Sequence, residues 1–216
     1  MLGCAFPPFH SGILAAFAFV PFLIMFESLD RYGEAIRTSY AWMFTLHLVT
    51  LYWTGGFTHG KDIYLMIAGA ALLVFHPLFY VPVILAFVFF RRRYGFKQAI
   101  IVFPFLWITM EFLLSKGELS FPWLTLGNTQ TYDLDAIQIA SFTGVYGISL
   151  WLLWINVLTY GLYRKLITRE VRIGTRAIVL RVGTIVLLFL IPKIYGIYRE
   201  SLREFCYENH RILEHR

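Results

Sequence analysis

Charged residues are scarce in this sequence, and cysteine is scarcer still. Aspartate, glutamate, lysine and arginine make up only 15% of the 216 residues, whereas 58% are hydrophobic and 19% are aromatic. Soluble globular domains carry about 25% charged residues, so this balance argues against a soluble core and favours the membrane class. The two cysteines, Cys4 and Cys206, lie near opposite ends of the chain, without a C-x-x-C pair or a histidine cluster. We therefore expect no disulfide and no metal site, and we expect no cofactor.

A basic face on a polar domain is also missing. The formal net charge of +6 would suit nucleic acid if Lys and Arg gathered on one soluble surface. Here they stand between apolar runs, where the membrane surface explains them better. We therefore expect a membrane, and no nucleic acid, as a partner. The first residues also lack the basic segment that opens a cleavable signal peptide.

Six apolar runs, separated by short polar loops, cover most of the chain. They predict about six transmembrane helices, because a span needs about 20 apolar residues. The runs cover residues 12–26, 38–57, 63–90, 99–114, 137–163 and 177–197. Pro77 and Pro82 interrupt the longest run, so we expect its helix to be kinked or broken near His76. The predicted fold is all-α, a polytopic integral membrane helix bundle over residues 1–198 with a charged tail over 199–216.

The basic residues of the short loops alternate between the two sides of this predicted bundle. One side carries Arg31, Arg37, Arg91, Arg92, Arg93, Lys97, Arg164, Lys165, Arg169, Arg172 and Arg176. The opposite loops carry only Lys61 and Lys116. Loops rich in Lys and Arg are cytoplasmic in membrane proteins. The segment around Trp123 and the tail after the last run are therefore predicted to face the other compartment.

A carboxylate in an apolar run and a helix-breaking proline lie close together in the sequence. Glu111 lies near the end of the apolar run 99–114, and an ionisable group in such a helix is a functional candidate because hydrocarbon disfavours it. The compact sequence Phe121-Pro122-Trp123 follows a short polar linker, and its proline cannot continue a helix. Irregular backbone at membrane depth is tolerated only where protein or water covers it. This region is therefore the candidate site.

The same region resembles a known family. The sequences PFLWITMEFLL, SFPWLTLGNTQ and IASFTGVYGISL follow one another between residues 104 and 150. In combination they resemble the membrane portion of bacterial apolipoprotein N-acyltransferase. The matching positions are Trp107, Glu111, Phe112, Leu113, Phe121, Pro122, Trp123, Leu124, Gly127, Gln130, Gly144, Val145 and Gly147. Fainter similarity lies at FPPF, residues 6–9, and at LYWTGGF, residues 51–57.

The resemblance implies a role in the maturation of bacterial lipoproteins. The family transfers an acyl chain from a phospholipid to the N-terminal amine of a lipoprotein's diacylglyceryl-cysteine, at the periplasmic side of the inner membrane. A glutamate base, a lysine and a cysteine nucleophile in a nitrilase-like domain carry out that chemistry. The present sequence resembles only the membrane part, and its start corresponds to the inside of the family's first helix. Cys206 stands in a Cys-Tyr-Glu run similar to that of the nucleophile, but its charged surroundings indicate an ordinary thiol.

Whether this chain is itself an enzyme is therefore open, and no residue of it is predicted to be catalytic. We expect it to be inactive alone, as a fragment, as a frameshifted gene product, or as half of a split enzyme completed by a separately encoded nitrilase-like domain. By the resemblance, six residues line or brace a groove that admits lipid tails. They are Glu111, Phe121, Pro122, Trp123, Gly127 and Gln130.

Simpler interpretations and other classes stay open. Glu111 could be a hydrogen-bond partner within the bundle, or its side chain could reach the membrane interface. Trp123 could belong to the aromatic belt at that interface. His47 and His76 are expected to be packed or hydrogen-bonded core histidines without a functional role. A small multi-pass transporter or channel subunit is the main alternative, favoured by Glu111, Arg181, Asn156 and the predicted kink, although no internal repeat supports it. A structural membrane protein that docks a soluble enzyme through its tail is the third class.

Overall fold

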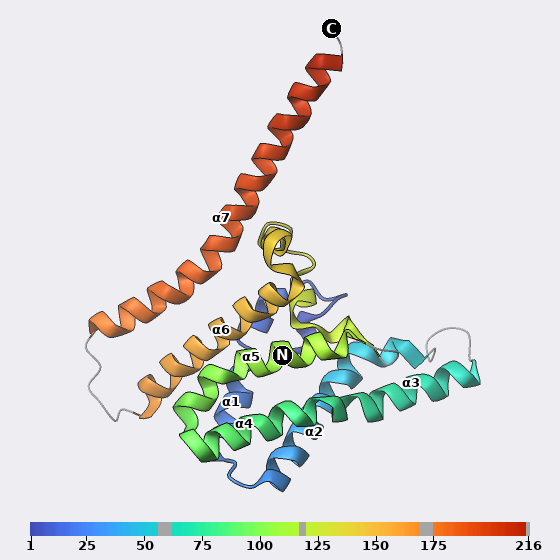
Figure 1. Cartoon of the computed structure of the whole chain (residues 1–216), viewed down its shortest axis with the longest axis vertical. Helices are drawn as coiled ribbons and strands as arrows, with labels where there is room; N and C mark the ends of the chain where they lie inside the picture. Colours follow the sequence, from blue (N-terminus) through green and yellow to red (C-terminus); the bar gives the residue numbers. More distant parts are fainter. Residues whose placement is uncertain (56–61, 117–119, 169–174, 215–216) are drawn as a thin grey trace.

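Helices make up the regular structure of this protein. The computed structural model describes residues 1–55, 62–116, 120–168 and 175–214, with side chains described as far as residue 203. The helices are α1 (Val20–Ser28), α2 (Tyr32–Leu51), α3 (Ile63–Phe75), α4 (Val81–Tyr94), α5 (Phe96–Leu114), α6 (Ala140–Thr168) and α7 (Thr175–Glu214). No strand occurs within these ranges. The predicted all-α class is confirmed (Figure 1).

Several short 3-10 turns separate or extend these helices. They are η1 (Gly3–Ala5), η2 (Gly12–Ala16), η3 (Tyr52–Gly55), η4 (His76–Tyr80), η5 (Pro122–Leu124), η6 (Leu126–Gln130) and η7 (Ala136–Ile139). The turn η4 lies between α3 and α4 and contains Pro77, so the predicted break near His76 is confirmed. The run over residues 12–26 is also broken, into η2 and α1, which its composition did not predict.

The helices are of membrane length. Within the described residues, four stretches are long and apolar enough to cross a membrane, namely Ile63–Tyr94, Phe96–Leu114, Ala136–Ile167 and Thr175–Arg203. A further apolar stretch, Gly12–Ser28, is shorter. The remaining expected span, over residues 38–57, corresponds to α2 and η3, which are not among these four stretches. The prediction of a polytopic membrane bundle is confirmed in class, with four of the expected spans meeting the length and composition of a crossing helix.

Phenylalanine rings from three helices fill the interior. Phe19 precedes α1, Phe22 and Phe26 lie on α1, Phe87 lies on α4, and Phe103 lies on α5; none is more than 2% exposed. Adjacent rings pack edge to face or stacked, with centroids 4.3 Å apart for Phe22 and Phe26 and 5.7 Å apart for Phe87 and Phe103. Such ring pairs add about 0.5–1.5 kcal/mol beyond the burial of their surface. They hold α1 against the α4 and α5 pair.

A buried asparagine satisfies the backbone at the break between η2 and α1. The side-chain oxygen of Asn156, on α6, accepts a hydrogen bond from the backbone N–H of Phe19 at 2.8 Å. Its amide nitrogen donates to the carbonyl oxygens of Ala15 at 2.8 Å and of Leu152 at 2.9 Å. Unpaired backbone groups are costly in a membrane interior. Asn156 therefore permits the break, and its polar atoms are used within the bundle.

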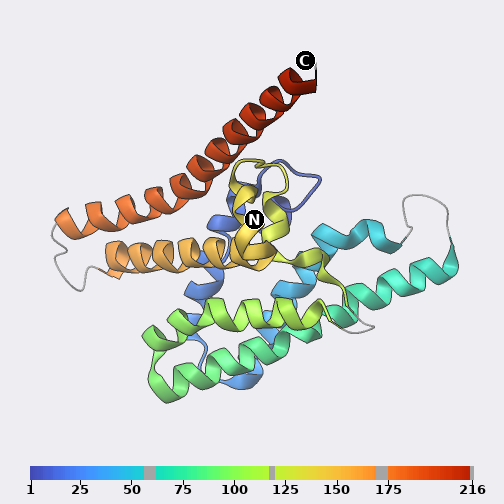
Figure 2. The same cartoon turned by 45° about the horizontal axis from the view of Figure 1, so that its top comes forward.

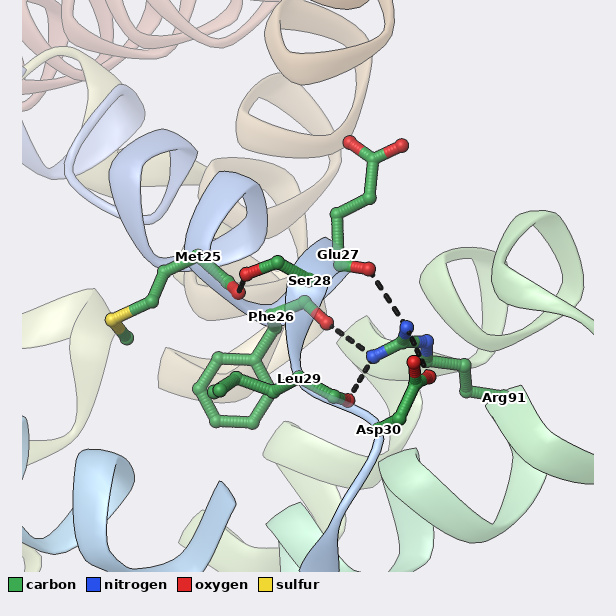
Figure 3. Close-up of polar contacts among 7 residues, drawn as sticks. All are labelled: Met25, Phe26, Glu27, Ser28, Leu29, Asp30 and Arg91. Carbon is green, nitrogen blue, oxygen red and sulfur yellow. Dashed lines mark hydrogen bonds and ion pairs between the residues drawn. The ribbon is translucent and has the colours of Figure 1, made fainter. Parts of the chain in front are cut away.

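The other end of α1 is closed by a guanidinium group. Arg91, on α4, donates to the carbonyl oxygens of Phe26, at 2.7 Å, and of Leu29. It also donates to the carbonyl oxygen of Glu27 and to the carboxylate of Asp30, each at 2.7 Å (Figure 3). The last carbonyls of a helix lack partners within the helix itself. Arg91 supplies hydrogen-bond donors to these carbonyl oxygens, and this contact joins α4 to α1.

Residues 120–139, which precede α6, form a cap segment on one end of the bundle. It curls over the first turns of α6 and lies beside the N-terminal residues of the chain (Figure 2). The last helix, α7, runs beside α6 and then projects away from the other helices (Figure 1). The indole N–H of Trp151, on α6, donates to the carbonyl oxygen of Leu188 on α7 at 2.7 Å. The cap segment contains five of the six predicted site residues, and α7 packs against its last turn, η7.

Candidate functional site

Glu111 ties the end of α5 to the cap segment. Its side chain is 2% exposed. The oxygen Oε1 accepts hydrogen bonds from the indole N–H of Trp107, one turn earlier, at 2.9 Å, and from the backbone N–H of Leu126 at 2.7 Å. Leu126 is the first residue of η6, where a backbone N–H has no helical partner. Of the two simpler interpretations, Glu111 as a partner within the bundle agrees with these contacts, and a side chain reaching for the interface does not.

The second carboxylate oxygen of Glu111 is different. Within the described residues, Oε2 is buried and makes no hydrogen bond that meets both distance and angle, although the hydroxyl of Ser149, on α6, lies near this carboxylate. A buried polar atom without a partner costs about 1–3 kcal/mol, and more for a charged group. At the end of a membrane helix, a ligand, a water molecule or a proton would satisfy such an atom. Glu111 is therefore both a structural anchor and a polar group with bonding capacity left.

Gly127 lets the cap segment approach α6 closely. Its backbone N–H donates to the hydroxyl of Ser149, on α6, at 2.9 Å. A Cβ atom at this position would lie 2.5 Å from the carbonyl oxygen of Val145, which is closer than real Cβ contacts allow. Only glycine permits this approach without a shift of the backbone. Nothing in the sequence pattern singled out Ser149, because a serine in an apolar helix has no distinctive spacing.

Gln130 joins the cap segment to the N-terminal part of the chain. It is 4% exposed, and its Nε2 donates to the carbonyl oxygen of Gly12 at 2.8 Å and to the hydroxyl of Thr129 at 2.9 Å. The contact with Gly12 joins residues that are 118 positions apart in the sequence. Glu111, Gly127 and Gln130 thus form an inner, buried set that positions the cap segment against α5, α6 and η2.

The Phe-Pro-Trp residues form an outer set. Phe121 is half-buried, with its ring 5.4 Å from the ring of His76. Pro122 and Trp123 are exposed, and Trp123 is 51% exposed. The indole of Trp123 meets that of Trp53 edge to face, at 5.5 Å between centroids. The six predicted site residues thus share one end of the bundle, with three facing inward and three lying at or near its surface.

Two buried histidines lie next to this site. The Nε2 of His47, on α2, is 2.7 Å from the Nδ1 of His76, and the Nδ1 of His47 is 2.7 Å from the carbonyl oxygen of Met43. They are 0% and 3% exposed, respectively. The expectation of hydrogen-bonded core histidines is confirmed. Among the described residues, no group of three or more His, Cys, Asp or Glu side chains is placed to hold a metal ion. The side chain of Cys206 lies outside the described part of the chain.

Comparison with known proteins identifies the class of this membrane bundle. The chain belongs to the family of the apolipoprotein N-acyltransferase N-terminal domain, whose family model matches residues 1–158. That range contains all six predicted site residues, and the resemblance drawn from their motifs is confirmed.

Curated apolipoprotein N-acyltransferases are similar to most of the chain. That of Chlorobaculum tepidum is 35% identical over 81% of this chain and 32% of its own length. That of Geobacter metallireducens is 29% identical over 94% of this chain and 39% of its length, and that of Rickettsia prowazekii is 26% identical over 88% and 38%. The chain thus spans about a third of the length of these relatives. No solved structure matches it.

Proposed function

We propose that this chain is the membrane part of a phospholipid:apolipoprotein N-acyltransferase. The proposed reaction breaks the ester bond between an acyl chain and a phospholipid's glycerol and forms an amide bond to the N-terminal amine of a diacylglyceryl-cysteine, releasing lysophospholipid. The partners are then a phospholipid donor, a lipoprotein acceptor and the membrane. Family membership, shown over residues 1–158, supports the reaction, and the cap segment held by Glu111 supports the position of the lipid site.

The six site residues have separate roles in this proposal. Glu111, Gly127 and Gln130 fix the cap segment, so that the outer residues stand at the membrane interface where an acyl chain enters. Trp123 and Trp53 form a paired indole surface there, and tryptophan prefers the interface because its ring is apolar and its N–H is polar. Glu111 is the one acidic residue of this inner set, and its Oε2 makes no hydrogen bond within the described residues. The covalent chemistry belongs to a nitrilase-like domain, either downstream or separately encoded.

Substitution in a full-length relative tests the proposed site. Trp123→Ala and Glu111→Gln, at the matching positions, are expected to lower acyl transfer to a lipoprotein substrate by at least tenfold. Glu111→Gln retains an oxygen for Trp107 and Leu126 and removes the charge, so its effect separates charge from support of the fold. Tyr64→Ala, at an 80% exposed aromatic of α3, is the matched control and should leave transfer unchanged. Unchanged transfer in both site variants would refute the proposed site.

The activity of the 216-residue chain by itself is tested with labelled phospholipid. We propose that it forms no acyl-thioester alone, since the resemblance assigns the nucleophile to the nitrilase-like domain. Labelled acyl groups trapped on Cys4 or Cys206, and released by hydroxylamine, would contradict this. Co-purification with a nitrilase-like protein would instead show a split enzyme.

We also propose an orientation in the bacterial inner membrane, with the cap segment and the tail periplasmic. The support is the unequal distribution of Lys and Arg between loops. A cysteine placed at Lys116, in a chain without Cys4 and Cys206, should react with a membrane-impermeant thiol reagent in spheroplasts. The matched cysteine at Lys97, at the other end of α5, should react only after the membrane is permeabilised. The reverse pattern would invert the proposed orientation.

The transporter alternative has lost one of its supports. Asn156, which favoured a polar pathway, makes three hydrogen bonds to backbone groups. These contacts explain its presence in the bundle without a transported ion.

A further inference from the structure

Arg181 places a charge inside an apolar helix. It lies on α7, within the stretch Thr175–Arg203 that is long and apolar enough to cross a membrane. Its Cα atom is about 9 Å along the helix axis from that of Thr175, at 1.5 Å per residue. A guanidinium group keeps its charge in proteins, and a charge at this depth is costly unless it is paired or reaches a polar surface. Arg181 therefore needs an anion or water.

The side chain of Arg181 belongs to the face of α7 that packs on the bundle. Arg181 is half-buried, whereas its neighbours Leu180 and Val182 are 73% and 43% exposed. Residues three or four positions apart share one face of a helix. From Arg181 onward, the residues of α7 at this spacing are partly buried against the core, namely Ile185, Leu188, Phe189 and Tyr195. The guanidinium is therefore directed toward α6 and away from the outer face of α7.

A glycine of α6 leaves room for this guanidinium. A Cβ atom built on Gly161 would lie 3.4 Å from Nη1 of Arg181, so the guanidinium lies over the position that a side chain would occupy. Lys165 is four residues further along α6, on the same face as Gly161, and is exposed. The helices α6 and α7 run side by side here (Figure 1). We call Gly161, Lys165 and Arg181 the α6–α7 junction.

The protein supplies no carboxylate to this junction within the described residues. Neither Arg181 nor Lys165 takes part in any ion pair in that part of the chain. Each acidic side chain described at this end of the bundle pairs with another cation: Glu27 with Arg164 at 2.7 Å, Asp30 with Arg91 at 2.7 Å, and Glu34 with Arg31 at 3.8 Å. The junction thus keeps a positive charge that must be balanced from outside these residues.

The membrane contains a suitable anion at this level. Basic positions between transmembrane helices bind the headgroups of anionic lipids, and a guanidinium can donate two parallel N–H bonds to one phosphate. An arginine this close to a helix end can extend its head to the interface. Apolar side chains beside the junction are exposed and offer contact to acyl chains: Ile167 is 60%, Val179 63% and Leu180 73% exposed. Charge and apolar surface together fit a phospholipid better than a soluble anion.

We propose that Arg181 binds the phosphate of an anionic phospholipid at the α6–α7 junction. The guanidinium donates to the phosphate oxygens, and Lys165 adds a second cation that disfavours a zwitterionic headgroup. Gly161 and Lys165 lie in the last turns of α6, whereas the cap segment precedes its first turn. The lipid is therefore bound at the end opposite the candidate site. It is distinct from the donor lipid of the proposed function, and the inference does not depend on acyl transfer.

The test is direct lipid binding by the purified 216-residue chain in detergent micelles, measured by native mass spectrometry. The probes are phosphatidylglycerol, phosphatidylcholine and diacylglycerol with the same acyl chains. Phosphatidylglycerol should bind about tenfold more tightly than phosphatidylcholine, a difference of about 1.4 kcal/mol. Diacylglycerol lacks the phosphate and should bind more weakly than either.

Variants locate the binding. Arg181→Gln should remove the tenfold preference, and Lys165→Gln should remove part of it. Arg92→Gln is the matched control, because Arg92 is an exposed arginine at the same end of the bundle, with its guanidinium over the ring of Tyr32. This substitution changes the net charge by the same amount and should leave the preference intact.

Three results would overturn the proposal. One is equal binding of phosphatidylglycerol and phosphatidylcholine by the unaltered chain, a measurement that requires no variant to fold. Another is a preference that survives Arg181→Gln. The third is an equal loss of preference in Arg181→Gln and Arg92→Gln, which would assign the lipid to the overall positive charge of this end.

Discussion

The two ends of the α4 and α5 pair use charged side chains in opposite ways. At one end, Arg91 donates to three carbonyl oxygens at the end of α1, those of Phe26, Glu27 and Leu29, and to Asp30. At the other end, Glu111 accepts the backbone N–H that opens η6. The two ends are separated by α5, whose 19 residues span about 28 Å. Both contacts satisfy orphan backbone groups at the ends of helical elements.

The difference lies in what remains unpaired. Both nitrogens Nη1 and Nη2 of Arg91 have partners, including a carboxylate that balances the charge. The oxygen Oε1 of Glu111 accepts two hydrogen bonds, whereas Oε2 makes none that meets both distance and angle within the described residues, with the Ser149 hydroxyl nearby. A fully satisfied charged group stabilises a fold, whereas one with bonding capacity left can also meet a ligand. The Arg91 end therefore has a structural role, and the Glu111 end is the candidate site.

The largest expected effect on stability is at the Arg91 end. Arg91→Ala leaves several carbonyl oxygens and Asp30 without their donor, and should lower the free energy of unfolding by about 3 kcal/mol. The measurement is reversible unfolding in mixed detergent micelles. Arg93→Ala, an exposed arginine of the same helix, is the control and should change stability by less than about 0.5 kcal/mol. Equal effects of the two substitutions would show that Arg91 acts only through its charge.

The close approach at Gly127 should give the next largest effect. Gly127→Ala places a Cβ atom 2.5 Å from the carbonyl oxygen of Val145, and should cost about 1–3 kcal/mol as the cap segment shifts from α6. Gly183→Ala, in α7, meets nothing within 4 Å and should be neutral or stabilising by up to about 1 kcal/mol. Unfolding of both variants is measured under the same conditions. A neutral Gly127→Ala would show that the cap does not depend on this approach.

The smallest expected effect is at the outer turn. The side-chain amide of Asn128 donates to the carbonyl oxygens of Pro122 and Trp123, at 3.2 and 3.1 Å. Asn128→Ala should lower stability by only about 0.5–1 kcal/mol. It should also loosen the turn that presents Trp123, increasing quenching of indole fluorescence by iodide. Thr109→Ala, an exposed position on α5, is the control. Unaltered quenching in Asn128→Ala would show that other contacts hold this turn.

Much of the fold could be predicted because the membrane restricts the choice of structure. Apolar runs of about 20 residues become helices, since hydrocarbon offers no partner to backbone groups. Pro77 marked the break that η4 occupies, because proline removes a donor and clashes with the preceding turn. The break between η2 and α1 was missed. It depends on Asn156, which lies 137 residues from Phe19, and no local pattern reports such a contact.

The sequence indicated where the candidate site residues lie along the chain, but it did not indicate which side chains they contact. Glu111 and the Phe-Pro-Trp sequence pointed to the end of α5 where the six predicted residues lie, since a buried charge and a helix-breaking proline each stand out in an apolar sequence. That this end is a functional site stays a prediction. The partners of these residues did not stand out. Ser149 is an ordinary polar residue within a helix, and the pairing of Lys193 with Asp133 joins two segments that are distant in the sequence.

The sequence by itself determined that this protein is an all-helical membrane bundle of the apolipoprotein N-acyltransferase family, because composition and short motifs are properties of neighbouring residues. Only the tertiary structure decided which side chain completes which helix end, and which polar atoms remain without a partner. The physical reason is that a broken helix leaves backbone groups needing partners, and those partners come from whichever helix packs against the break.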